Sequence, residues 1–173
     1  MWRYLLVYLL MLTASMLTHA YSLPEDVGVE PLQNCTIAAA SADTVFCNSD
    51  LVLINNSFLK LTTNLRLIIN GSLYIGNNVK LNAAGVYSFD IEVSGSVLPL
   101  QNNNNPIVIA NIVAAGDINF GNNSDISGNL VAGDDINLGN NSKVNGTCTA
   151  AGGNYLKFCG APPQPTLHHF RIS

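Results

Sequence analysis

Charged residues are scarce in this sequence. Asp, Glu, Lys and Arg make up only 10% of its 173 residues, whereas about 25% is typical of a soluble domain. Seven Lys and Arg stand against eleven Asp and Glu, which gives a net charge of −4. We therefore expect no basic patch and no nucleic-acid partner, because binding phosphates requires clustered cations. The composition also excludes a charged disordered tail and a coiled coil.

Histidine and tryptophan are nearly absent. Trp2 and His19 lie in the N-terminal leader described below, and no His occurs between Tyr21 and Leu167. A Ser or Cys nucleophile in that region would have no imidazole base beside it. A solenoid acyltransferase or carbohydrate-active enzyme is therefore disfavoured, and we expect no enzymatic activity and no cofactor.

Long apolar runs are missing except at the N-terminus. Residues 1–20 carry one positive charge at Arg3, an apolar core over residues 4–12, and small residues at Thr18 and Ala20. This pattern is typical of a secretory signal cleaved after Ala20, and its core is shorter than the roughly 20 residues that a membrane span needs. We expect an exported chain in the periplasm, at the cell surface or secreted, with no stable membrane span after cleavage.

Four cysteines flank the most regular part of the chain, with Cys35 and Cys47 ahead of it and Cys148 and Cys159 at its end. Cysteines of an exported chain can oxidise. Pairing in sequence order closes two short loops, each worth about 3 kcal/mol in the chain-entropy model. Three connectivities are possible, and the sequence does not prove this one. The alternative, a zinc site, needs four converging ligands, and the remaining histidines, His168 and His169, lie in a Pro-rich tail.

Asn and Gly are abundant, with 23 and 14 copies. Many of them occur at fixed positions of a repeat. Residues 112–129 read IVAAGDINFGNNSDISGN and residues 130–147 read LVAGDDINLGNNSKVNGT, which are identical at ten of eighteen positions. A third, broken copy begins at Cys148. A fixed period of this kind indicates a structural unit that stacks on its neighbours.

Apolar residues alternate over three to five positions within each copy, which is typical of short strands. Three strands and three turns per copy predict one coil of a single-stranded β-solenoid, with coils about 4.8 Å apart. Inward side chains then form columns, such as Ile118 over Ile136 and Phe120 over Leu138. About five coils between residues 51 and 158 predict an all-β rod roughly 25 Å long.

The predicted organisation has four parts. They are a signal peptide (1–20), an N-terminal cap segment (21–50), the β-solenoid (51–160), and a Pro-rich linker with the start of a further domain (161–173). The repeat is less strict upstream, because Gly76 and Gly121 are 45 residues apart, which is not a multiple of eighteen. We expect longer coils or an insertion there, with residues 101–106 as a candidate bulged corner.

The GNN motif of each copy is expected to form a structural turn, because Gly and Asn tolerate a positive φ. The predicted turn residues are Gly121, Asn122, Asn123, Gly139, Asn140 and Asn141. Asn122 over Asn140 and Asn123 over Asn141 would stack as amide ladders.

Asp117 and Asp135 are one coil apart and are candidates for a shared cation site. The other interpretation is that each caps a turn and faces water. We favour turn caps over a metal site, because calcium needs about six to eight oxygen ligands and no other acidic group than the adjacent Asp134 is expected to converge there.

The run FGNNSDISGNLVAGDDINLGNNSKVNGTC, residues 120–148, resembles the N-terminal β-solenoid of MshQ-type proteins, which are encoded with mannose-sensitive haemagglutinin (MSHA) type IV pili. The likeness covers most of residues 35–159. It implies a structural or adhesive component of a bacterial cell surface that is linked to pilus biogenesis, with pilus or cell-surface proteins as partners. The run is also similar, more loosely, to the bactofilins, which are polymer-forming β-solenoids. That likeness implies a self-assembling scaffold and self-association.

Overall fold

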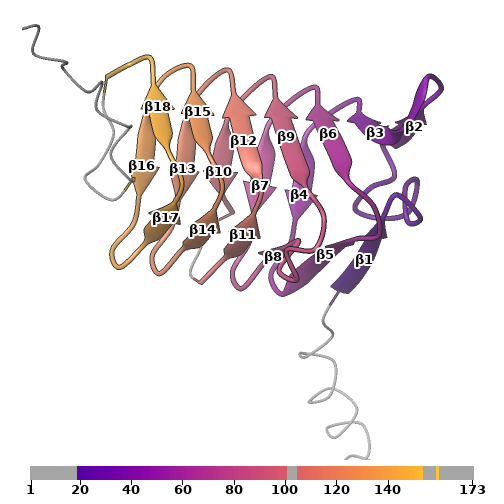
Figure 1. Ribbon diagram of the computed structural model, residues 1–173, viewed down its shortest axis with the longest axis horizontal. Coiled ribbons are helices and arrows are strands. Elements are labelled where there is room, and N and C mark those ends of the chain that lie inside the picture. The colour runs from indigo at the N-terminus through magenta and orange to yellow at the C-terminus, as the bar shows by residue number, and fades with distance from the viewer. Residues whose placement is uncertain (1–18, 101–104, 154–158, 160–173) are drawn as a thin grey trace, which may run out of the picture.

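Strands form all the regular structure. The computed structural model describes residues 19–100, 105–153 and 159, and in these ranges it contains eighteen strands and no helix. The strands follow one another around three sides of a prism, and successive circuits stack along its long axis (Figure 1). The predicted all-β solenoid of about five coils is therefore confirmed. No described residue belongs to a helix that is long and apolar enough to cross a bilayer.

Each side of the prism is one sheet. The six-stranded sheet contains, in spatial order, β1 (His19–Leu23), β5 (Ser57–Leu61), β8 (Lys80–Leu81), β11 (Ile107–Ile109), β14 (Asp125–Ser127) and β17 (Lys143–Asn145). The five-stranded sheet contains β4 (Leu51–Leu53), β7 (Leu73–Ile75), β10 (Val97–Pro99), β13 (Ile118–Phe120) and β16 (Ile136–Leu138). The seven-stranded sheet contains β2 (Cys35–Ala38), β3 (Ser41–Cys47), β6 (Leu65–Ile69), β9 (Phe89–Val93), β12 (Asn111–Ala114), β15 (Leu130–Ala132) and β18 (Cys148–Ala150).

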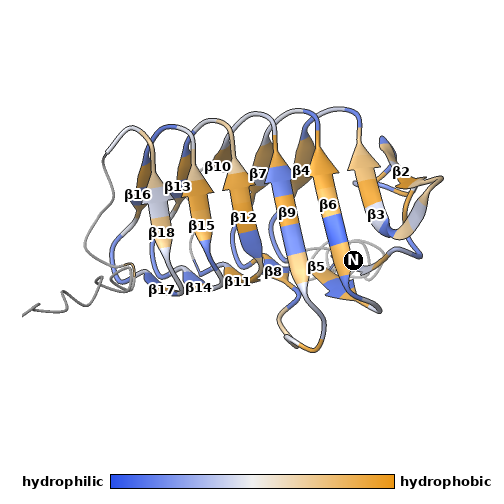
Figure 2. Cartoon of the chain, turned by 45° about the horizontal axis from the view of Figure 1, so that its top comes forward, coloured by the Kyte–Doolittle hydropathy of each residue, from blue (hydrophilic) through white to orange (hydrophobic). Residues whose placement is uncertain are grey.

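Stacked coils pair in parallel register. Ile118 lies beside Ile136 and Phe120 beside Leu138, so the predicted columns and the eighteen-residue period hold for these coils. Side chains alternate between the interior and the surface along each strand, as a period of two requires. Figure 2 shows the matching pattern of hydropathy, with hydrophobic and hydrophilic bands alternating along strands such as β6 and β9. Each fully buried Leu or Ile contributes about 1.5–3 kcal/mol, so the interior columns are the main source of stability.

The upstream coils are longer than eighteen residues, as the spacing of the GNN motifs predicts. Leu51 pairs with Leu73, 22 positions later, and Leu73 pairs with Val97, 24 positions later. Val97 in turn pairs with Ile118, 21 positions later. The candidate bulged corner lies in this last coil, but its residues 101–104 are outside the described ranges.

The N-terminal end of the rod is covered by a cap. Strand β1 adds to the six-stranded sheet in parallel with β5, and β2 adds to the seven-stranded sheet as the antiparallel partner of β3. Leu23 and Leu32, which belong to this cap, have no exposed surface.

Residues 1–18 of the expected signal peptide lie outside the described ranges, and cleavage after Ala20 would leave the buried Leu23 in place. The expected linker, residues 161–173, is also outside them.

Both disulfides join cysteines in sequence order, which confirms that pairing among the three possible ones. Cys35 bonds Cys47 across the β2–β3 hairpin, and Cys148 bonds Cys159 at the other end of the rod. With both pairs oxidised, the described residues contain no free thiol, and the zinc interpretation of the cysteines is wrong.

One buried hydroxyl provides a stability prediction. The Ser57 hydroxyl is buried and has no hydrogen-bond partner, whereas the Ser124 hydroxyl occupies the corresponding position in a later coil and donates to the Gly121 carbonyl over 2.7 Å. A buried polar group without a partner costs about 1–3 kcal/mol. Ser57→Ala is therefore expected to raise the free energy of unfolding by about 1 kcal/mol, as measured by urea denaturation.

Ser124→Ala is the matched control, because it deletes the same atom from a hydroxyl that is satisfied. We expect it to lower the free energy of unfolding by about 1 kcal/mol. A loss of stability in both variants would mean that Ser57 has a partner in solution.

Candidate functional site

At the corner that precedes the five-stranded sheet, each coil supplies a side-chain oxygen to the next coil. The residues that form this column are Asp50, Ser72, Ser96, Asp117 and Asp135. The backbone N–H of each later residue donates to the side-chain oxygen of the residue before it in the column, over 2.7, 3.2, 3.1 and 3.0 Å in turn. The column thereby satisfies backbone groups at a corner where no strand ladder is available.

The two candidate cation ligands belong to this column. Asp117 Oδ1 accepts the hydrogen bond from the Asp135 N–H, so it has a structural role at the corner. Among the described residues, no group of three or more His, Cys, Asp or Glu side chains could hold a metal ion. The hydrogen bond from the Asp135 N–H supports the interpretation of Asp117 as a corner residue.

A column of asparagines forms the corner between the five- and six-stranded sheets. It consists of Asn56, Asn78, Asn105, Asn123 and Asn141, whose φ angles are 61°, 54°, 60°, 55° and 57°. Asn is one of the few non-glycine residues that adopt this left-handed conformation readily. The same backbone turn therefore recurs in every coil, including the longer ones.

Side-chain amides join this column along the rod. Asn78 Nδ2 donates to Asn56 Oδ1 over 3.1 Å, and Asn105 Nδ2 donates to Asn78 Oδ1 over 3.3 Å. Asn141 Nδ2 donates to Asn123 Oδ1 over 3.3 Å, as expected of an amide ladder.

The first Asn of the motif differs from the ladder expected for Asn122 and Asn140, because its side chain bonds the backbone of the next coil. The Asn140 N–H donates to Asn122 Oδ1 over 2.8 Å, so this side chain supports the backbone of the next coil. The two asparagines of each GNN turn thus hold neighbouring coils together in two ways, one through side chains alone and one through the backbone.

The glycine of the motif is not the left-handed residue of the turn. In the last GNN turn the positive φ falls on Asn141, not on Gly139. A Cβ at Gly139 would lie 2.5 Å from the Gly121 carbonyl carbon and 2.6 Å from the Asn122 nitrogen. Glycine is required here because the backbone of the neighbouring coil approaches too closely for any side chain.

Charge is distributed unevenly over the three faces. Of the four Lys and Arg in the described ranges, Lys60, Lys80 and Lys143 lie on strands of the six-stranded sheet, which carries one acidic residue, Asp125. Lys143 pairs with Asp125 over 3.1 Å, whereas Lys60 and Lys80 form no ion pair with a described residue. Three of these four cations therefore lie on one face, although the chain as a whole is acidic.

The seven-stranded sheet carries the opposite charge. Its strands contain Asp43, Asp90 and Glu92 against one cation, Arg66. The Arg66 guanidinium donates to Glu92 through Nε and Nη2, each over 2.7 Å. This hydrogen bonding, together with the charge of Glu92, raises the pKa of Arg66 above its usual value.

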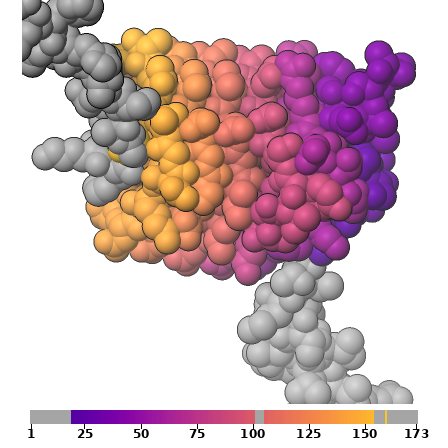
Figure 3. Space-filling model, viewed as in Figure 1, coloured from indigo at the N-terminus to yellow at the C-terminus, as the bar shows by residue number. Residues whose placement is uncertain are grey.

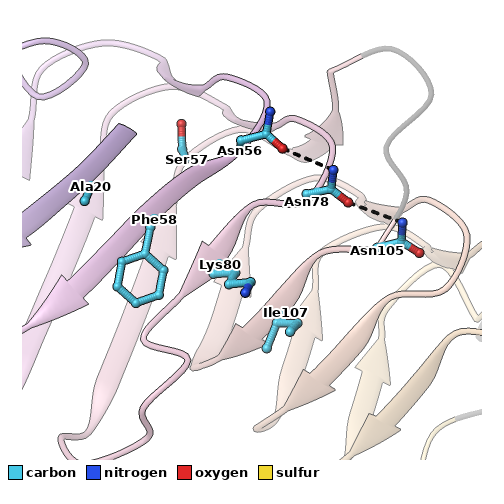
Figure 4. Close-up of a pocket in the computed structure, with 8 residues that line it drawn as sticks. All are labelled: Ala20, Asn56, Ser57, Phe58, Asn78, Lys80, Asn105 and Ile107. Atoms are coloured by element: carbon cyan, nitrogen blue, oxygen red, sulfur yellow. Dashed lines mark hydrogen bonds between the residues drawn. The ribbon is translucent and has the colours of Figure 1, made fainter. Parts of the chain in front are cut away.

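A shallow groove of about 570 Å³ lies on the cationic face, beside the asparagine column. Its floor is a row of outward side chains that the register places on neighbouring strands, namely Phe58 on β5, Lys80 on β8 and Ile107 on β11. Asn56, Asn78 and Asn105 form one wall. Figure 4 shows the three floor side chains on the same side of the sheet, with the hydrogen-bonded amides along the edge. The floor therefore offers one ammonium group between two apolar side chains.

Sequence reasoning missed this groove. Lys80 is 22 positions after Phe58, and Ile107 is 27 positions after Lys80, so the eighteen-residue period does not align them. The available signal was the Asn-Asn pair, which occurs at residues 55–56, 77–78 and 104–105 and ends two positions before Phe58, Lys80 and Ile107, respectively. Aligning the coils on that pair would have brought the floor residues together.

Comparisons of the chain with protein-family models, with curated proteins and with solved structures found no match. The fold and the groove therefore rest on the geometry described above.

Proposed function

We propose that the chain is an exported, non-enzymatic β-solenoid that serves as a structural and adhesive component of a bacterial cell surface. The observation that carries this proposal is the construction of the rod. Coils are tied together at the corners by side-chain columns, the N-terminal end is covered by a cap, and a disulfide lies at each end. Two disulfides are compatible with an oxidising extracellular environment.

The non-enzymatic part of the proposal is supported by the lack of a base. No His lies between Tyr21 and Leu167, and the groove floor contains one ionisable group, Lys80. Acid–base or nucleophilic chemistry generally needs at least two cooperating groups. A rigid face that binds without reacting fits these residues better.

The link to MSHA-type pilus biogenesis is the finer part of the proposal, and the resemblance of residues 120–148 to MshQ-type solenoids supports it. Its test is deletion of the gene in the host, followed by counting surface pili and measuring attachment of cells to a surface. We expect both to fall, and to recover when the intact gene is restored. Normal piliation together with normal attachment would contradict the proposal.

A self-assembling scaffold of bactofilin type is the second candidate. Strands β16, β17 and β18 each end their sheet, so within the described ranges their outer edges have no strand partner. Such edges can pair with another chain. Electron microscopy of the mature protein distinguishes the two candidates, because filaments of stacked copies are expected only for the scaffold.

A further inference from the structure

We propose that the groove on the six-stranded sheet binds a carboxylated polysaccharide, which lies along the rod beside the asparagine column. This inference rests on the adhesive role proposed above and names the class of its ligand. Three features of the groove support it, namely its charge, its amide wall and its apolar floor.

The positive charge of the groove favours an anionic ligand. Lys60 and Lys80 are exposed and form no ion pair with a described residue. They lie on the adjacent strands β5 and β8, both pointing outward, with Lys60 two residues beyond Phe58, the register partner of Lys80. A carboxylate in the groove can therefore form a charge-assisted hydrogen bond with Lys80 and remain close to Lys60.

The amide wall suits a polymer of sugars. Each side-chain amide has two N–H donors and two acceptor lone pairs, and the ladder uses one donor of Asn78 and one of Asn105. Both residues are exposed, so their remaining donors and acceptors can form hydrogen bonds with sugar hydroxyl groups. Coils rise by about 4.8 Å, which is close to the advance of one hexose in an extended chain. The wall therefore presents one amide for each successive sugar.

The floor adds apolar contact. Phe58 and Ile107 flank Lys80 and are both half-buried, so part of each side chain faces the groove (Figure 4). The C–H face of a pyranose ring packs well on such surfaces. No Trp follows residue 20, so in this groove the aromatic ring is that of Phe58.

A phosphodiester polymer such as nucleic acid fits this face less well. The chain has a net charge of −4, and the face carries only two lysines outside an ion pair. Nucleic acids bind through many simultaneous phosphate contacts. A glycan with one carboxylate per sugar or per repeat needs few cations and uses the amides as well, so the observations favour the glycan.

The test measures binding of the mature full-length protein to immobilised alginate, a carboxylated polysaccharide, with dextran as a neutral polymer. We expect binding to alginate that weakens as salt is raised, and no binding to dextran. Lys80→Gln is expected to weaken binding about tenfold or more, because it removes the charge-assisted hydrogen bond to the carboxylate. Phe58→Ser, with an unchanged circular dichroism spectrum, is also expected to weaken it.

Arg66→Gln is the matched control. It removes one positive charge from the seven-stranded face and leaves the groove intact, so the affinity for alginate should stay within about twofold of the unmodified protein. Equal losses in the Lys80 and Arg66 variants would overturn the assignment of the groove. Binding to dextran as strong as to alginate would overturn the role of charge.

Other occupants give distinct results. The protein can be tested in the same way on vesicles of anionic phospholipid and on single-stranded DNA. The ligand class is overturned if either is bound as tightly as alginate and Lys80→Gln weakens that binding equally. A self-association measured by sedimentation that Lys80→Gln abolishes would assign the groove to a second copy. If alginate binding is found but deletion of the gene leaves attachment normal, the glycan site stands and the adhesive role fails. If deletion of the gene abolishes attachment but the protein does not bind alginate, the adhesive role stands and the glycan site fails.

Discussion

Replacing Ile112 with Asp is expected to unfold the centre of the rod. Ile112 lies in β12 with no exposed surface, between Ile91 of β9 and Leu130 of β15. An aspartate at this position would be buried without a partner, which costs several kcal/mol. We expect the free energy of unfolding in urea to fall by about 4 kcal/mol or more, with loss of the β-sheet circular dichroism signal at lower urea concentration.

Val113→Asp is the matched control for this change. Val113 is the next residue of the same strand, and 47% of its surface is exposed. The new carboxylate would point to solvent, so we expect a cost of about 1 kcal/mol or less, mainly from the lower strand propensity of Asp. Similar losses in the two variants would show that the inward and outward assignments of the strand are wrong.

Loss of the N-terminal disulfide is expected to release the cap. Cys35 and Cys47 join β2 to β3, and β3 is the first strand of the seven-stranded sheet that runs parallel to its neighbour β6. Closing a loop of this length is worth about 3 kcal/mol in the chain-entropy model. The double variant Cys35→Ser/Cys47→Ser should therefore lose amide-exchange protection at Val45 and Phe46, because a detached hairpin exposes these strand edges.

The control for this prediction is Cys148→Ser/Cys159→Ser, which removes the other disulfide and leaves the cap in place. We expect protection at Val45 to be unchanged in that variant. Peptide mapping of the unreduced protein adds an independent check, since a bond between either N-terminal cysteine and either C-terminal one would contradict the arrangement. Unaltered exchange at Val45 in the first variant would mean that packing alone holds the cap.

The repeating coils could be predicted because the two copies keep the same residue at ten of eighteen positions. Ile118 and Ile136 occupy the same column, and eighteen residues separate them in both sequence and register. Identity at ten positions per copy made that register visible. Upstream, Leu51, Leu73 and Val97 form the same column with spacings of 22 and 24, and no fixed period reveals their pairing.

Other features depend on contacts that a single sequence does not display. The role of Gly139 follows from the approach of the Gly121 backbone in the coil beside it. Strand β1 includes His19 and Ala20, which the sequence assigns to the expected signal peptide. The groove around Lys80 needs the register of two irregular coils. In each case the missing information is a distance between chain segments far apart in sequence.

The coil-by-coil stacking that Figure 3 shows along the rod is the basis of every proposal made above. Nuclear Overhauser contacts between backbone protons of the isotope-labelled mature protein test it most directly. The solenoid predicts contacts between the backbones of Ile118 and Ile136 and between those of Ile112 and Leu130, which are parallel partners eighteen residues apart. Contacts joining residues 112–114 to residues 118–120 in antiparallel register, as in a hairpin, would contradict the stacked coils and with them the groove.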